Sequence, residues 1–206
     1  MMLRNNAWLT LAILAAMSIF GCSKTDGPQS QSQTSKDRNF QQNSAQANRT
    51  RLEPPAAAVY DFLEAVRTGN DEKATKMLST TAREKAAALN RNITPPASDT
   101  ARFTIGKVQY VGEDGAQVAS TWIDIDDEGQ SNSDGAVWVL RREGEGWRVA
   151  GVAAIIFPGE SPLLLNFEDP EDMIKKQQWV REEIRRRTEK DNLQAKEADN
   201  SGNSFR

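Results

Sequence analysis

The stretch from residue 101 to residue 157 constrains the fold most, because apolar residues alternate there in segments separated by polar, glycine-containing turns. The pattern predicts four strands, at 101–111, 116–125, 136–142 and 146–157. Gly106 interrupts the first strand where the apolar phase shifts, which predicts a bulge. Strands joined by such short connections indicate an antiparallel meander.

Three helical segments precede these strands. The first runs from Pro54 to Gly69, and its apolar residues recur at helical spacing: Val59, Phe62, Leu63 and Val66. Short helices are expected at 71–78 and 80–89, the latter with Thr81 and Glu84 as a capping box. Helices followed by a meander indicate an α+β domain over 54–157, with the helices on one face of a curved, antiparallel four-stranded sheet. The residues expected to share one core are Phe62, Leu63, Val66, Ile105, Val118, Trp122, Trp138, Leu140, Trp147 and Val149.

This order of helices and strands resembles the nuclear-transport-factor-2-like fold, the cone-shaped fold also used by ketosteroid isomerase and polyketide cyclases. The segment VYDFLEAVRTGNDEKATKML is similar to its opening helix pair, and GWRVAGV to its closing strand. In the isomerases of this fold a tyrosine on the first helix donates to an oxyanion and an aspartate moves the proton. The resemblance implies Tyr60 for the first role, with Asp61, Asp99 and Asp124 as candidate aspartates.

The residues themselves favour a plainer interpretation of Tyr60 and Asp61. Adjacent helix residues point about 100° apart, so the two side chains cannot face one cavity squarely. Tyr60 is then a half-buried packing aromatic and Asp61 a charge that faces solvent.

The acidic segment DIDDEGQSNSDG resembles a calcium loop in part. Asp124, Asp126 and Glu128 take the first, third and fifth positions, but Gly135 stands where a bidentate glutamate is needed. We therefore expect a polar hairpin turn. Nothing in the sequence calls for a metal or another cofactor.

The N-terminus has the features of a secretory signal over residues 1–21. After Arg4 comes the apolar run AWLTLAILAAMSIF, which is shorter than the roughly 20 residues that a membrane span needs. Its end, IFGC, resembles the lipobox of bacterial lipoproteins, which implies cleavage before Cys22 and lipid on its thiol. The chain is then expected at the cell envelope, lipid-anchored and extracytoplasmic. An incidental cysteine after an ordinary signal peptide and an uncleaved anchor are the alternatives.

Polar residues dominate from the lipidated cysteine to the first helix, over residues 22–51, and this composition predicts a disordered tether. A segment that binds peptidoglycan or a partner is the alternative.

A loop and a charged helix are expected over 158–192, with Asp169 as the cap before Pro170, and a disordered tail over 193–206. The segment PLLLNF either packs over the sheet, covers its open edge or forms an exposed contact patch. Met173, Val180 and Ile184 form a thin apolar stripe, suited to a helix that rests on the domain or on a second copy in a homodimer.

The chain has no histidine and one cysteine, which excludes histidine-based triads and histidine-ligated zinc. Its formal charge of −3 and isoelectric point near 5.2 give no reason to expect nucleic-acid binding. Two classes remain. The favoured one is a non-catalytic, membrane-anchored lipoprotein that binds a small ligand or an envelope protein. The other is an isomerase- or cyclase-like enzyme that uses Tyr60 and a buried aspartate.

Overall fold

A computed structural model describes residues 49–89, 97–126 and 128–202, with side chains described through residue 194. The predicted leader, Cys22 and most of the predicted tether lie outside these ranges. The helices are α3 (Pro54–Arg67), α4 (Asp71–Lys76), α5 (Thr80–Ala88) and α6 (Pro170–Gly202). None of the described helices combines the length and the apolar character that crossing a bilayer requires.

Five strands form one antiparallel sheet in the order β1-β2-β3-β4-β5. Their bounds are β1 (Arg102–Val111), β2 (Gly115–Ile125), β3 (Ser131–Glu143), β4 (Gly146–Ala154) and β5 (Leu163–Asn166). The expected α+β class is confirmed, and so is the bulge, because the β1–β2 register shifts between Ile105 and Val108. The expected number of four strands is wrong. Within PLLLNF, Leu163–Asn166 pairs with β4, so this segment covers an edge that would otherwise expose unpaired backbone groups.

The starts and stops of the first helices have local causes. Pro54 and Pro55 occupy the first positions of α3, where a missing N–H costs nothing. At its end Gly69 adopts φ 67° and donates to the Val66 carbonyl, while Asn70 donates to the Ala65 carbonyl. This pair of bonds is a Schellman motif, which accounts for the predicted stop at Gly69.

The predicted capping box of α5 is wrong. Ser79, not Thr81, caps the helix, because its hydroxyl oxygen accepts from the Ala82 N–H at 3.2 Å. The cause is a long-range contact: Ser79 N–H donates to the Val149 carbonyl of β4 at 2.8 Å. That bond fixes the chain before the helix starts, so the helix begins at Thr80.

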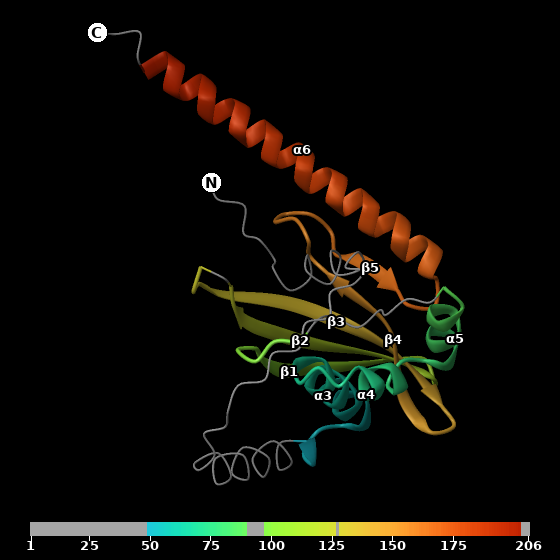
Figure 1. Cartoon of the computed structure of the whole chain (residues 1–206). Helices are drawn as coiled ribbons and strands as arrows, with labels where there is room; N and C mark the ends of the chain where they lie inside the picture. The colour runs from blue at the N-terminus through green and yellow to red at the C-terminus, as the bar shows by residue number, and fades with distance from the viewer. Residues whose placement is uncertain (1–48, 90–96, 127, 203–206) are drawn as a thin grey trace, which may run out of the picture.

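The helices and the sheet form two layers around one core. Figure 1 shows α3 and α4 on one face of the sheet and α6 along the β5 edge. Eight of the ten residues expected in the core are buried, whereas Trp147 and Ile105 are half-buried and pack against its margin. Trp147 lies near the end of the sheet, where its ring meets Tyr110 edge-on at 6.0 Å.

The C-terminal helix is attached to the domain through its first turns. The Asp169 carboxylate accepts from the Asp172 N–H at 3.1 Å, as expected of a cap, and Met173 and Val180 are buried. Farther along, the Arg187 guanidinium lies 3.9 Å from the centre of the Phe157 ring, a cation–π contact. α6 then continues past residue 192, where we expected a tail to begin, and Figure 1 shows this part projecting from the body.

Candidate functional site

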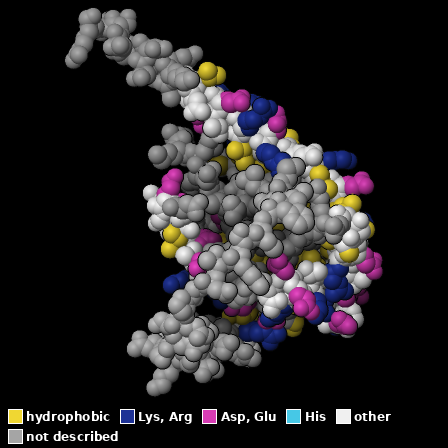
Figure 2. Space-filling view, viewed as in Figure 1, with side chains coloured by type: hydrophobic (Ala, Val, Ile, Leu, Met, Phe, Trp, Pro, Cys, Tyr) yellow, Lys and Arg dark blue, Asp and Glu magenta, His cyan; other side chains and the backbone are white. Residues whose placement is uncertain are grey.

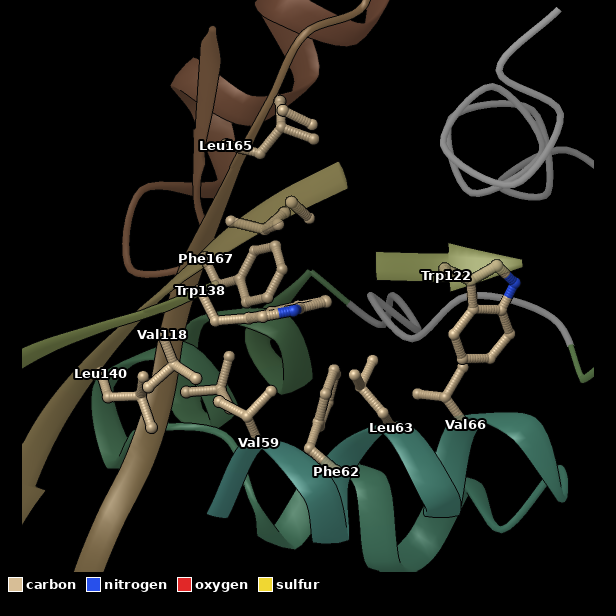
Figure 3. Packing of buried hydrophobic residues seen from close by; sticks show 14 of the residues in the cluster. Val59, Phe62, Leu63, Val66, Val118, Trp122, Trp138, Leu140, Leu165 and Phe167 are labelled. Carbon is tan, nitrogen blue, oxygen red and sulfur yellow. The ribbon is translucent and has the colours of Figure 1, made fainter. Parts of the chain in front are cut away.

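The space between α3 and the middle of the sheet is occupied by side chains. Figure 3 shows Val59, Phe62, Leu63 and Val66 of α3 directed toward side chains of the sheet, among them Trp138. The rings of Phe62 and Trp138 meet edge-on with centroids 5.2 Å apart, and both are 1% exposed. This part of the interior is therefore a packed core.

Tyr60 lies at the margin of that core. Its ring meets Phe103 of β1 edge-on at 5.3 Å, and Phe103 in turn stacks on Trp122 at 6.0 Å. Burial, together with the nearby Glu64 carboxylate, raises the pKa of the Tyr60 hydroxyl above its usual range. Tyr60 is half-buried and packs on an aromatic neighbour, in line with the plainer interpretation of this residue.

Asp61 forms an ion pair with Arg49. Arg49 donates from Nε to both carboxylate oxygens, at 2.8 and 2.9 Å, and from Nη2 to Oδ2 at 2.6 Å. This forked ion pair joins the segment before α3 to the helix. Asp61 is thereby engaged in a structural contact and its side chain is only 18% exposed, so the expectation that it faces solvent is wrong.

Asp99 is exposed. Asp124, in contrast, accepts hydrogen bonds from the neighbouring segment and from its own strand. Ser98 and Thr100 hydroxyls donate to the Asp124 carboxylate at 2.8 and 2.5 Å, and the Ile125 N–H donates at 2.9 Å. Partial burial opposes ionisation, but these hydrogen bonds outweigh it and hold the pKa of Asp124 below its usual range. A carboxylate held ionised in this way is a poor general base near neutral pH.

The acidic loop forms a hairpin turn. The Asp126 carboxylate accepts from the backbone N–H of Glu128 and Gln130, at 3.0 and 2.8 Å, and from the Asn132 side chain at 2.9 Å. Gly129 adopts φ 77°, which the turn requires. Within the described ranges, His, Cys, Asp and Glu form no group of three that suits a metal ion.

Sequence reasoning missed Asp134, the one aspartate among the buried polar residues of the described chain. It is 6% exposed, lies opposite Trp122 in the β2–β3 register, and shares the inward-facing side of β3 with Ala136 and Trp138. We had assigned it to a turn because Ser and Gly surround it. The signal was the alternation itself, which extends back from Trp138 in steps of two.

The opposite face of the sheet, here called the outer face, carries exposed apolar side chains. One row of paired residues crosses four strands from β2 to β5, and we call it the outer row: Ala119, Val137, Ala153 and Leu164. Val137 is 37% exposed and Leu164 43%, and Ile123 on the same face is also exposed. The outer row contains no charge, and its two alanines leave it flat enough for close approach by another surface.

Charged side chains on α6 pair with neighbours of opposite sign. Figure 2 shows Lys and Arg intermingled with Asp and Glu over α6 and the body in that view. On α6 the pairs include Lys176 with Asp172 at 2.6 Å and Arg187 with Glu183 at 2.7 Å. Arg186 and Arg187 together lower the pKa of Glu183 to about 2. A helix surface of paired charges such as these suits contact with solvent.

Comparisons with known proteins found likenesses among solved structures only. No family model matches the chain, and no curated protein matches its sequence. The association domain of Caenorhabditis elegans CaMKII is 17% identical with a TM-score of 0.35, covering 56% of this chain and 94% of that one. A ketosteroid isomerase-like protein from Erwinia carotovora atroseptica is 15% identical with a TM-score of 0.35, over 47% and 88% of the two chains.

A third likeness is to a putative calcium/calmodulin dependent protein kinase II association domain from Xanthomonas campestris. It is 17% identical with a TM-score of 0.35, and the match covers 50% of this chain and 86% of that one. Sequence identities this low carry no information about activity or partners.

Proposed function

We propose that this chain is a lipid-anchored protein of the bacterial cell envelope whose α+β domain binds a partner and catalyses no reaction. The anchor is Cys22 at the end of the IFGC motif, and residues 23–48, before the segment that Arg49 joins to α3, hold the domain away from the membrane. One acyl chain binds a membrane only marginally, whereas two or three anchor a protein durably. This anchoring places the domain on the extracytoplasmic side.

The non-catalytic role is supported by the packing under α3. Phe62 and Trp138 fill the interior where a cavity tyrosine and aspartate would need to meet a substrate. Tyr60 packs against Phe103, and Asp61 is held by Arg49. None of these contacts positions an acid and a base for one bound molecule.

The single observation that carries the binding role is the exposed outer row. An apolar strip that crosses four strands costs free energy in water unless another surface covers it. The partner we propose is a second copy of this chain, whose identical outer row gives apolar surface opposite apolar surface. Two such copies would form a closed, symmetric dimer.

Sedimentation velocity tests the dimer. The chain from residue 22, carrying Cys22→Ser, should sediment as a monomer at about 1 μM and as a dimer at about 100 μM if the dissociation constant is micromolar. Val137→Asp should weaken the dimer by at least about tenfold, because it places an unpaired charge in the contact. Leu193→Asp is the matched control, since Leu193 is exposed on α6 and lies outside the outer face. A monomer at every concentration, or equal effects of the two variants, would refute the proposal.

Asp134 is the specific observation that favours the enzyme as the second candidate function. A buried carboxylate beside Trp122 stands on the same face as Phe103, against which Tyr60 packs. In that case Tyr60→Phe and Asp134→Asn should each abolish turnover of a carbonyl substrate while circular dichroism remains unchanged. Turnover that survives both changes would remove this candidate.

A further inference from the structure

A hollow of about 330 Å³ lies beside the turn that joins β1 to β2. Its floor is largely apolar, with Val111 and Val139 among the lining residues, and Asp114 and Arg141 also line it. This volume is at the lower end of the range for small-molecule pockets, about 300 to 1,000 Å³. It therefore suits a ligand much smaller than a cofactor.

Arg141 is held in a fixed orientation at this hollow. Its Nε donates to both carboxylate oxygens of Glu168, at 2.9 and 2.7 Å, and the Glu168 side chain is 12% exposed. Within the described chain, no hydrogen bond engages the terminal Nη groups of Arg141, whose side chain is 62% exposed. A guanidinium with its terminal N–H groups available binds a carboxylate in a defined geometry.

Asp114 is the second charged group of the hollow. It adjoins Arg141 in space, because Gly115 pairs with Arg141 and the Asp114 carbonyl accepts from the Arg142 N–H at 2.8 Å. Even so, no ion pair joins the Asp114 carboxylate to Arg141 or to any other cation among the residues described. The hollow is thus lined by one acidic and one basic residue on neighbouring segments, and Arg141, already paired with Glu168 through Nε, keeps its Nη groups for a second carboxylate.

The turn keeps these two groups close to the apolar floor. A Cβ at Gly115 would lie 2.5 Å from the Val111 carbonyl oxygen, so any larger residue would force the turn open. Glycine is therefore required at this position for the tight turn from β1 into β2 beside the hollow.

We propose that this hollow binds a free amino acid with an aliphatic side chain. The ligand's ammonium group lies against Asp114, its carboxylate meets the Nη groups of Arg141, and its side chain covers Val111 and Val139. Two opposite charges on one small molecule match the two charges of the site, and the apolar floor selects the side chain. The hollow lies on the outer face next to the outer row, because Val139 and Arg141 alternate with Val137 along β3, so the ligand and a second copy would occupy neighbouring parts of one face.

Isothermal titration of the full-length protein in detergent micelles tests the proposal, with L-leucine as the probe. Isoamylamine lacks the carboxylate of leucine, 4-methylpentanoate lacks its amine, and glycine lacks its side chain. L-leucine should bind, and each single-charge analogue should bind at least about tenfold more weakly, because one charge-assisted contact is lost. Glycine should also bind more weakly. No heat with L-leucine up to about 10 mM, or equal affinity for the analogues, would overturn the proposal.

Paired variants locate the site. Asp114→Asn and Arg141→Gln should each weaken leucine binding by about tenfold or more, since each leaves one ligand charge without its partner. Their neighbours supply the controls, and Glu113→Gln and Arg142→Gln should leave the affinity unchanged. Leu164→Asp, at the β5 end of the outer row and outside the lining of the hollow, should also leave it unchanged, so that failure of the dimer and failure of this site remain distinguishable. Leucine binding that persists in both test variants, or that disappears in a control or in Leu164→Asp, would contradict the assignment to this hollow.

Discussion

Replacing Phe62 by alanine tests whether the interior is packed as the structure indicates. Phe62 is 1% exposed and meets Trp138 edge-on at 5.2 Å, so the change removes a whole buried ring. Truncations of this kind cost about 3 to 5 kcal/mol of unfolding free energy. Phe62→Leu keeps most of the apolar volume but loses the ring pair, which is worth about 1 kcal/mol.

Urea unfolding followed by far-ultraviolet circular dichroism measures both changes. With an m-value of about 2 kcal/mol per M, Phe62→Ala should lower the midpoint by about 2 M. Leu193→Ala is the control, because Leu193 is 62% exposed, and it should change stability by less than about 0.5 kcal/mol. A cost below about 1 kcal/mol for Phe62→Ala would mean that the interior is open, and the case against a ligand cavity there would fail.

Three further predictions concern Asp124, Gly69 and Cys22. The folded-state pKa of Asp124 lies below the ordinary 3.8, so the ionised carboxylate stabilises the fold at neutral pH and this contribution is lost as the pH falls below about 4. Urea titrations should therefore show that Asp124→Asn loses less stability than the natural chain between about pH 6 and about pH 3. Gly69→Ala should lower the free energy of unfolding more than Gly129→Ala in the same assay. Both positions have positive φ, which costs alanine about 1 to 2 kcal/mol. Of the two, only Gly69 would place the new Cβ against a neighbour, Ala97 Cβ at 3.1 Å. Cys22→Ser should give unprocessed or released protein in membrane fractionation, and an intact mass showing an unmodified Cys22 in the natural protein would disprove the anchor.

The parts of the fold that follow from short-range patterns were predictable. The alternation in β2 and β3 and the helical spacing in α3 report burial directly, because each side chain's direction is set by its own backbone. β5 was missed as a strand because its three consecutive leucines show no alternation. Its assignment depends on pairing with β4, which is a tertiary contact.

The same distinction explains the candidate site. The partner of Asp61 is Arg49, twelve positions away in a segment predicted to be tether, and no local pattern joins the two. Asp134 lies in a run of Ser, Asn and Gly that is typical of turns, and this composition obscured the alternation with Ala136 and Trp138 that places it inside. Which carboxylates are buried or paired was thus decided by contacts between distant segments.

Disulfide formation between two copies is the most direct test of the proposed association. The chain has a single cysteine, so a version with Cys22→Ser and Val137→Cys carries one thiol at the centre of the outer row. Under mild oxidation this version should form a covalent dimer much faster than the matched Leu193→Cys version, and dilution should slow it. Equal rates of cross-linking for the two versions would contradict association through the outer face.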